Sequence, residues 1–336
     1  MSIPSRMRAL VLNEIGPPEN LQVTERAVPE PGPGEVLIKV ELAGLLYSDA
    51  EARRGTYYSR TVVPWYPGRE AAGTIAAEGS GVEQFRVGQR VAALVLTGAC
   101  QAEYVLASTS LTRAPTVRAP AEILSLPDSV SAGSALVYLV NFRLAHLALR
   151  AWSKAKAGSS VLIHGASGGM GSVLTQLAHA LGCRVLVTCR SDQEAQFCRS
   201  NGADHVVRLD EGPYPEAVRS IVPGGVEIIF NGVGGPTVNL DPKAIAPFGE
   251  IHLYGYVAGK PDLRLFEISH CVAIKTFSAD DFLPLPSFRA ATEAMYEWFR
   301  TGPLLDVGQV FPLGEAALAH RRLDEGRVIG KLALKP

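Results

Sequence analysis

Cysteine is scarce in this chain, and the few that occur exclude two ways of stabilising a fold. The 336 residues include 5 cysteines, an odd number, and no two of them form a Cys-x-x-Cys pair. A disulfide framework needs paired cysteines and a structural zinc site needs closely spaced ones, so the sequence encodes neither. Unpaired cysteines of this kind favour a reducing, cytoplasmic location.

An excess of charge of one sign and an uninterrupted membrane span are also missing. The 32 Lys and Arg residues are balanced by 33 Asp and Glu residues, and the net charge of -1 argues against nucleic acid or an anionic membrane as the main partner. The longest apolar run, residues 132–149, contains Asn141, Arg143 and His146, which a lipid-facing helix tolerates poorly. Residues 1–12 contain charge but no apolar core, so we expect no secretory signal.

The chain is long enough for two lobes. Its 336 residues exceed what one hydrophobic core usually organises, which is roughly 100 to 200 residues. The β-rich runs before residue 126 are short and separated by Pro and Gly, which predicts a small, mostly β barrel or partial sandwich. The strands expected in this lobe are residues 8–12, 35–42, 73–79, 90–96 and 102–107.

Beyond Pro127 the pattern changes to strands that alternate with helical segments. A helix is expected at about residues 131–150, and the strands and helices after it predict an α/β domain with a doubly wound parallel sheet. We predict a first domain at 1–126, a nucleotide-binding domain at 127–282 and a C-terminal segment at 283–336 that returns to the first domain. The strands expected in the second domain are residues 160–165, 184–189, 205–209, 226–232, 250–255 and 273–279.

The most specific motif is the glycine-rich turn HGASGGMG, which joins the apolar strand at 160–164 to a helix. Gly168 would let the backbone approach a pyrophosphate, Gly171 would let the helix pack closely on the strand, and the helix N-terminus would supply N–H groups. The alternative is a tight turn without a ligand. The turn residues expected to hold a dinucleotide are Ala166, Ser167, Gly168, Gly169, Met170 and Gly171.

The end of the next strand distinguishes NADPH from NADH. A site for the free ribose 2′-hydroxyl carries Asp or Glu there, whereas a 2′-phosphate is bound by Arg. This chain has Cys189 at that position, followed by Arg190 and Ser191, so the sequence predicts NADPH. Arg208, after the third strand, is expected to close the same pocket, although either arginine could instead be a solvated surface charge. Asp192 leaves a second alternative open, a carboxylate that binds the ribose.

Together these segments resemble the medium-chain dehydrogenase/reductase superfamily over nearly the whole chain. The resemblance implies a GroES-like, mostly β catalytic domain and a Rossmann nucleotide-binding domain. The matching segments are MRALVLNEIGPPENLQV, the A-G-x-x-x-x-D pattern of residues 43–49, PGREAAGTIAAEGSGVEQFRVGQRVAAL, AEYV, HGASGGMG, GEAALAH and IGKLALKP.

The zinc alcohol dehydrogenases of this superfamily hold a catalytic zinc with a Cys and a His, and this chain has Leu46 and Arg69 at those positions. Leu46 has no donor atom, and Arg69 is a permanent cation without a lone pair. The cysteine-rich lobe that binds structural zinc in those enzymes is also absent, and Cys100 alone replaces neither site. The resemblance is therefore to the zinc-free quinone oxidoreductases and enoyl reductases, and no metal is expected.

Without a metal to act as Lewis acid, a conjugated acceptor is easier to reduce than a simple ketone. Hydride added to an enone, an enoyl thioester or a quinone leaves an anion that a few hydrogen-bond donors can stabilise. Arg54 to Tyr57 match a segment whose tyrosine is implicated in protonation in some enoyl reductases, so Tyr57 is the first candidate acid and Tyr47 the second. Either could instead be an aromatic wall. Arg69 and Glu70 are expected to pair with each other or with neighbours.

Ligands of open α/β sheets bind beyond the carboxyl ends of the strands, which places further candidates near the nicotinamide. The residues expected there are Asn141, Asn231, Val233, Gly234, Tyr254, Gly255 and Tyr256.

We also expect a homodimer formed through the strand at 273–279, as in the relatives that the chain resembles. Two alternative functions remain: a reductase that acts in trans on carrier-bound intermediates, and a non-catalytic NADPH-binding protein.

Overall fold

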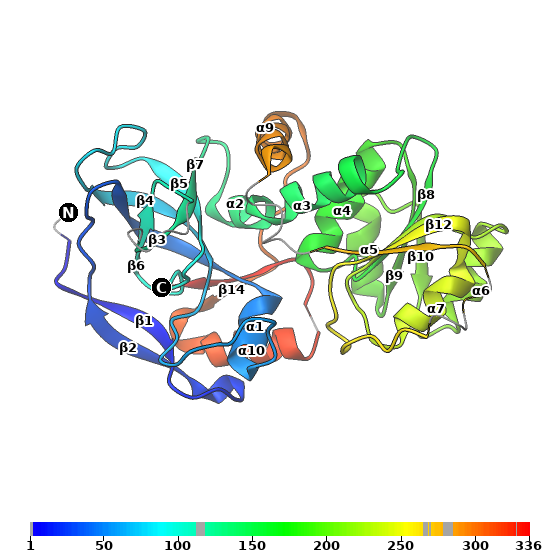
Figure 1. Cartoon of the computed structure of the whole chain (residues 1–336), viewed down its shortest axis with the longest axis horizontal. Coiled ribbons are helices and arrows are strands. Elements are labelled where there is room, and N and C mark those ends of the chain that lie inside the picture. Colours follow the sequence, from blue (N-terminus) through cyan, green and yellow to red (C-terminus); the bar gives the residue numbers. More distant parts are fainter. Residues whose placement is uncertain (1–2, 112–117, 265–267, 269, 278–284, 327) are drawn as a thin grey trace. The chain divides into compact units, whose positions relative to one another are not determined.

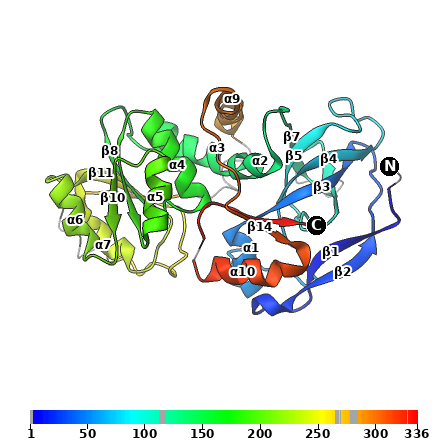
Figure 2. The ribbon, with the colours of Figure 1, turned by 180° about the vertical axis from the view of Figure 1, so that it is seen from behind.

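The computed structural model describes residues 3–111, 118–264, 268, 270–277, 285–326 and 328–336, and the chain divides into two compact units. Unit 1 comprises Met1–Leu139 and Leu304–Pro336, and unit 2 comprises Val140–Pro303 (Figures 1 and 2). The unit boundaries differ from the predicted 126 and 282, because α2 (Ala132–Leu139) packs on the sheet of unit 1 and α9 (Pro286–Thr301) packs on α3 (Asn141–Leu147) of unit 2.

Unit 1 is built around a mostly antiparallel sheet with the strand order β14-β15-β3-β4-β5-β7, in which β6 also pairs with β3. Alternate residues of a strand face the same side, so Val36, Ile38 and Val40 of β3 enter one buried cluster with Ile75. A hairpin of two further strands lies beside this sheet. The strands are β1 (Arg6–Leu12), β2 (Leu21–Ala27), β3 (Glu35–Leu45), β4 (Glu70–Glu78), β5 (Arg90–Val95), β6 (Tyr104–Ser108), β7 (Ala121–Ser125), β14 (Gln309–Pro312) and β15 (Leu332–Lys335).

The buried Arg53 connects the C-terminal segment of unit 1 to the first part of the chain. Helix α1 (Tyr47–Arg54) follows β3 directly and lies beside α10 (Ala316–Asp324) in both views of the ribbon (Figures 1 and 2). Arg53 is only 1% exposed, donates to the carbonyl of Gly16 at 2.6 Å and forms an ion pair with Asp324. Arg54 donates to the other carboxylate oxygen of Asp324 at 2.8 Å. These bonds attach the helix that precedes Tyr57 to the C-terminal segment.

Unit 2 contains a parallel sheet with the strand order β10-β9-β8-β11-β12-β13. The central strands are buried along almost their whole length, as expected for a parallel sheet covered on both faces. The strands are β8 (Ser160–His164), β9 (Arg184–Cys189), β10 (His205–Arg208), β11 (Val226–Asn231), β12 (Ile245–Leu253) and β13 (Ala273–Thr276). Helices α4 (Gly169–Ala180), α5 (Asp192–Ser200), α6 (Tyr214–Ile221) and α7 (Thr237–Ala244) connect them.

The strand order reverses direction between β8 and β11. From β8 the chain runs outward through β9 to β10, and it then crosses to β11 and continues outward through β12 to β13. Right-handed crossovers therefore place α4 and α5 on one face of the sheet and α6 and α7 on the other. The carboxyl ends of β8 and β11 flank this switch point, which is where open α/β sheets bind ligands.

The predicted α/β fold class is confirmed, with a mostly β domain and a doubly wound parallel sheet. The six strands predicted in unit 2 all form, although residues 278 and 279 of the last one lie outside the described residues. Strands β2, β7 and β14 and helix α1 were not predicted. The apolar stretch Ala132–Trp152 has the length and composition of a membrane span, but 89% of its window is buried inside the protein, as in a core helix.

A test of the fold concerns the close approach of α4 to β8. A Cβ added at Gly171 would lie 2.2 Å from the carbonyl oxygen of Gly165, so we expect Gly171→Ala to lower the free energy of unfolding by about 1–3 kcal/mol. This loss should occur although alanine is the better helix former. Urea titration measures it. At Gly168 the nearest atom to an added Cβ is 3.4 Å away, so Gly168→Ala is the matched control; equal unfolding midpoints for the two variants would contradict the packing argument.

Candidate active site

The glycine-rich turn of unit 2 forms a cradle at the carboxyl end of β8. Gly165 has a positive φ of 69°, which favours glycine, and Gly168 caps the start of α4. The first N–H groups of a helix have no acceptor within it, so those of α4 are available to an anion. A Cβ added at Gly168 would have one atom within 4 Å, the carbonyl oxygen of Gly165 at 3.4 Å, so the space beside Gly168 is open. Gly171 allows the close approach of helix and strand. The turn therefore fits a dinucleotide phosphate.

Arg190 and Ser191 lie together at the start of α5. The hydroxyl oxygen of Ser191 accepts the Glu194 N–H at 3.2 Å and caps the helix, which leaves the hydroxyl proton to donate. Arg190 is half exposed and donates to Glu194 at 2.9 Å. Arg208, by contrast, forms ion pairs with Asp192 and, at 2.7 Å, with Asp210. Two carboxylates thus offset the charge of Arg208, whereas Glu194 orients Arg190.

A buried polar network supports the carboxyl ends of β8, β9 and β11. Asp241, 0% exposed, contacts three side chains: His164 Nε2 at 2.9 Å, the Tyr214 hydroxyl at 2.8 Å and Asn231 Nδ2 at 2.7 Å. The other ring nitrogen of His164 lies 2.9 Å from Thr188 Oγ1. Sequence reasoning missed this network, although an ionisable His at the end of an apolar strand was its signal.

Asn231 is committed to the loop that follows β11. Its side-chain oxygen accepts the N–H groups of Val233 and Gly234, both at 2.9 Å, while its amide donates to Asp241. The side chain is therefore a support for the loop that carries the other predicted nicotinamide contacts. The sequence predicts Asn231 near the nicotinamide, and in the structure its side chain bonds to the loop backbone and to Asp241.

The loops after β11 and β12 lie against each other. A Cβ at Gly234 would come within 2.6 Å of Tyr256, and a Cβ at Gly255 within 2.5 Å of the Gly232 carbonyl oxygen. Tyr254 donates to the His164 carbonyl at 3.3 Å, and burial raises the pKa of its phenol. The predicted residues of both loops are thus brought together. Asn141, the remaining candidate, is buried at the start of α3.

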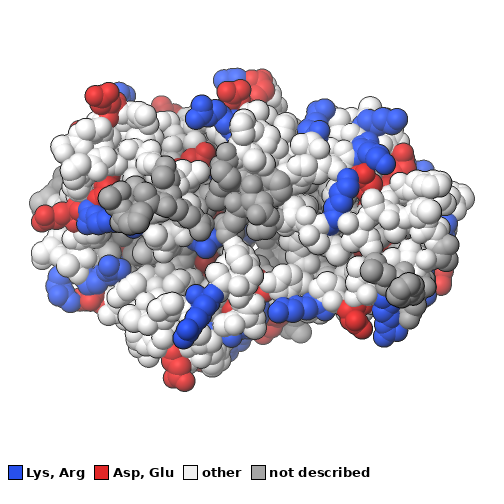
Figure 3. Space-filling view, in the orientation of Figure 1, with Lys and Arg blue, Asp and Glu red and all other residues white. Residues whose placement is uncertain are grey.

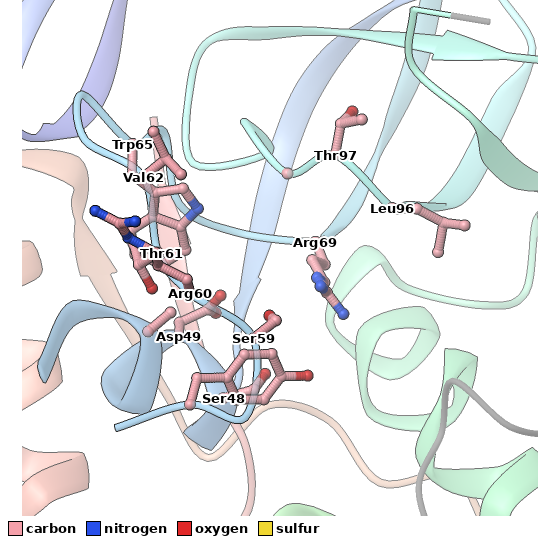
Figure 4. Close-up of a pocket in the computed structure, with 13 residues that line it drawn as sticks. Ser48, Asp49, Ser59, Arg60, Thr61, Val62, Trp65, Arg69, Leu96 and Thr97 are labelled. Carbon is pink, nitrogen blue, oxygen red and sulfur yellow. The ribbon is translucent and has the colours of Figure 1, made fainter. Parts of the chain in front are cut away.

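Unit 1 contains a pocket of about 220 Å³ (Figure 4). Tyr57 lines it, whereas Tyr47 lies outside the lining residues and its ring centroid is 5.3 Å from the guanidinium of Arg54. Arg69 extends toward Ser48 and Ser59 in Figure 4, and its guanidinium carbon lies 5.8 Å from the centroid of the Tyr57 ring. This distance is within the range of a cation–π contact. Of the two candidate acids, the structure therefore places only Tyr57 in the pocket.

Two polar residues near the lost metal-ligand positions, Glu70 and Cys100, are both buried. Glu70 forms a buried ion pair with Lys331, so of the two pairings that the sequence left open, one with a neighbour is present. Cys100 is fully buried, and burial raises the pKa of its thiol well above the ordinary value. Within the described part of the chain, no three His, Cys, Asp or Glu side chains are grouped so that they could hold a metal ion.

Among the described residues that line the pocket, Asp49 is the one with a carboxylate, and sequence reasoning gave it no role beyond its motif. It is 2% exposed, and burial raises its pKa to about 6. Its Oδ2 accepts the Leu46 N–H at 2.9 Å, which holds the start of α1. At neutral pH the carboxylate is therefore mostly ionised beside Arg69, and Arg69 acts to lower its pKa.

Comparison with known proteins gives a consistent result. The alcohol dehydrogenase GroES-like domain matches residues 32–119, and the zinc-binding dehydrogenase domain matches residues 169–280. A 2-haloacrylate reductase from Burkholderia sp is 29% identical over 98% of both chains, and a quinone oxidoreductase from Lama guanicoe is 30% identical over 98% of this chain and 97% of its own. The structure of a mycobacterial protein in complex with NADPH has a TM-score of 0.87 at 28% identity and covers 98% of this chain and 100% of that one.

These matches cover both units, and they agree with the glycine-rich turn, the doubly wound sheet and the mostly β first domain. The chain belongs to the medium-chain dehydrogenase/reductase superfamily, in its quinone oxidoreductase-like branch.

Proposed function

We propose that the chain is an NADPH-dependent oxidoreductase that reduces a conjugated acceptor without zinc. The observation that carries this proposal is the unit 1 pocket, where Tyr57 lies beside Arg69 at a position that a metal ligand would occupy in a zinc dehydrogenase. Leu46 and Arg69 offer no lone pair to a metal. The NADPH complex of a similar mycobacterial protein and the names of the two reductase relatives support the same activity.

We assign the cofactor to the carboxyl end of the sheet in unit 2. The N–H groups at the start of α4 would receive the pyrophosphate, and Arg190 and Ser191 would bind the 2′-phosphate. Arg208 would contribute less, because Asp192 and Asp210 already offset its charge. The backbone of the loops at 231–235 and 254–256, with Asn141, would line the nicotinamide.

NADPH supplies a hydride, which adds to the β-carbon of an enone or enoyl thioester or to a quinone. The negative charge that develops on the acceptor oxygen is stabilised by the guanidinium of Arg69. Tyr57 donates its hydroxyl proton to the α-carbon or to the quinone oxygen, and solvent returns a proton to the phenolate. One hydride and one proton thus reach the acceptor.

The activity is tested by the loss of NADPH absorbance in the presence of enones, enoyl thioesters and quinones. Turnover of at least one acceptor is the expected result. Tight NADPH binding with no turnover of any of them would instead support a non-catalytic NADPH-binding protein. Preference for a pantetheine thioester over the free enone would favour a reductase that acts in trans on a carrier protein.

Replacement of Arg190 tests the choice of cofactor. Loss of a charge-assisted contact with the 2′-phosphate should raise the Kd for NADPH about 10- to 100-fold in Arg190→Gln and leave the Kd for NADH nearly unchanged. Titration of cofactor binding by calorimetry measures both. Arg199→Gln, an exposed arginine in the last turn of the same helix, is the matched control. An equal loss for both cofactors in Arg190→Gln would show that Arg190 acts on folding and not on the phosphate.

Replacement of Tyr57 tests the proton donor. Removal of a positioned acid should lower kcat of Tyr57→Phe by about 10²- to 10⁴-fold, because the ring is retained and the proton is lost. Tyr47→Phe and Tyr58→Phe should keep most of the activity; Tyr58 is 64% exposed, and Tyr47 is not a lining residue. Unchanged turnover and unchanged stereochemistry of α-protonation in Tyr57→Phe would exclude Tyr57 as the acid.

We also propose that the protein is a homodimer that extends the sheet of unit 2 through β13. This strand is last in the sheet order, and no other strand of the described residues pairs with its outer edge. Light scattering during size-exclusion chromatography should give about twice the chain mass of 35.8 kDa. A monomer mass at all accessible concentrations would contradict the proposal.

A net charge near zero and the mixed charges on the face in Figure 3 support a small-molecule substrate over nucleic acid or membrane as partner. On that face the described basic and acidic side chains lie among one another, without separate regions of one sign. A cytoplasmic location is part of the same proposal.

A further inference from the structure

The pocket of unit 1 is more cationic than the chain as a whole. Of the described residues that line it, Arg60 and Arg69 carry positive charge and Asp49 carries negative charge, which leaves +1 in a chain with a net charge of -1. Arg60 is exposed, and in Figure 4 its guanidinium points away from Arg69. Arg69 is half-buried and extends into the pocket. The two arginines thus occupy different parts of its wall.

The guanidinium of Arg69 extends into the pocket, where it can bind an anion. A guanidinium has five N–H donors in its plane, and its contact with the Tyr57 ring is through an electrostatic attraction to the ring face. A carboxylate matches the planar arrangement of two of these donors, which makes bidentate binding possible. Asp49 is a buried carboxylate of the same pocket, and it accepts a hydrogen bond from the Leu46 N–H at 2.9 Å.

We propose that the acceptor of this enzyme is a small 2-enoate, a carboxylate conjugated with a carbon–carbon double bond, and that Arg69 binds its carboxylate group. The inference rests on the proposed function and names its substrate class. A volume of about 220 Å³ is below the roughly 300–1,000 Å³ of most ligand pockets, which fits a substrate of few atoms.

The chemistry explains why such an acceptor needs a cation. A free 2-enoate is a poor hydride acceptor because it is already an anion, and hydride addition at carbon 3 places a second negative charge on carbon 2 and the carboxylate oxygens. A bound guanidinium offsets that charge where it develops. Tyr57, whose ring centroid lies 5.8 Å from the Arg69 guanidinium carbon, then protonates carbon 2. The products are the saturated carboxylate and oxidised cofactor, and Arg60 at the exposed side raises the local concentration of anions.

The test compares 2-chloroacrylate with its methyl ester and with an enoyl pantetheine thioester, by steady-state NADPH oxidation. The chlorine makes carbon 3 more electrophilic, and the ester removes only the negative charge. The variants are Arg69→Gln, which removes the cation, and Arg69→Lys, which keeps a point charge without the planar fork. Arg86→Gln is the control for net charge, because Arg86 is exposed in unit 1 and outside the pocket.

We expect the wild-type protein to prefer the acid over the ester in kcat/KM. Arg69→Gln should lower kcat/KM for both substrates, because Arg69 stabilises the charge that develops on either acceptor. The loss should be about 10- to 100-fold greater for the acid, which also loses the charge-assisted contact of its carboxylate. Arg69→Lys should be intermediate, and Arg86→Gln should behave as the wild type. Preference for the ester or thioester in the wild type, or an equal loss for acid and ester in Arg69→Gln, would overturn the proposal.

A binding measurement separates this inference from the proposed function. Calorimetry with 2-chloropropanoate, the saturated carboxylate, and with its methyl ester needs no hydride transfer. If no acceptor is reduced but the carboxylate binds in an Arg69-dependent manner, the proposed reductase activity fails and the anion site stands. If acceptors are reduced but the carboxylate binds no better than its ester, the anion site fails and the reductase stands.

Discussion

The close contact between the start of α4 and the end of β8 is the constraint on which the nucleotide-binding unit depends. An added Cβ at Gly171 would lie 2.2 Å from the Gly165 carbonyl oxygen, so only glycine permits the helix to start where it does. That start directs the unpaired N–H groups of α4 at the switch point of the sheet. The buried carboxylate of Asp241 connects the ends of β8 and β11, because it bonds to His164 of one strand and Asn231 of the other. The contact of Gly171 with Gly165 and the buried carboxylate of Asp241 thus define the positions of the loops that follow β8 and β11.

The pocket of unit 1 is arranged by charge. Glu70 forms a buried ion pair with Lys331 from the C-terminal segment, and Arg53 forms another with Asp324. Removal of one partner of such a pair leaves an uncompensated buried charge, which costs several kcal/mol, typically about 3–5. These pairs therefore specify how the last part of the chain packs on the first part. Arg69 lines the pocket itself, and its guanidinium carbon lies 5.8 Å from the centroid of the Tyr57 ring.

The sequence predicted elements well where a strand was apolar along its whole length. β8 and β11 are buried at nearly every position, and hydrophobic runs of this kind are clear in one dimension. Strand β2 has only one buried residue and carries charged residues, so its pairing with β1 is not visible in its own composition. Helix α1 has a mostly polar sequence. Asp49 accepts the N–H of Leu46 at its start, and Arg53 near its end pairs with Asp324, a partner that is distant in sequence. The unit boundaries follow helix packing, which no local pattern encodes.

By itself, the sequence determined the chemistry that is available: a glycine turn that fits a phosphate, a cysteine followed by an arginine where a carboxylate would select NADH, and two ligand positions without a lone pair. These are properties of residue type, and no fold can change them. The tertiary structure decided where each of several equal candidates lies and which neighbours it contacts. Tyr57 lines the pocket and Tyr47 does not, Arg208 is offset by two carboxylates and Arg190 by one, and Asn231 supports a loop. The reason is that neighbours distant in sequence set exposure and local charge, and a one-dimensional pattern does not contain them.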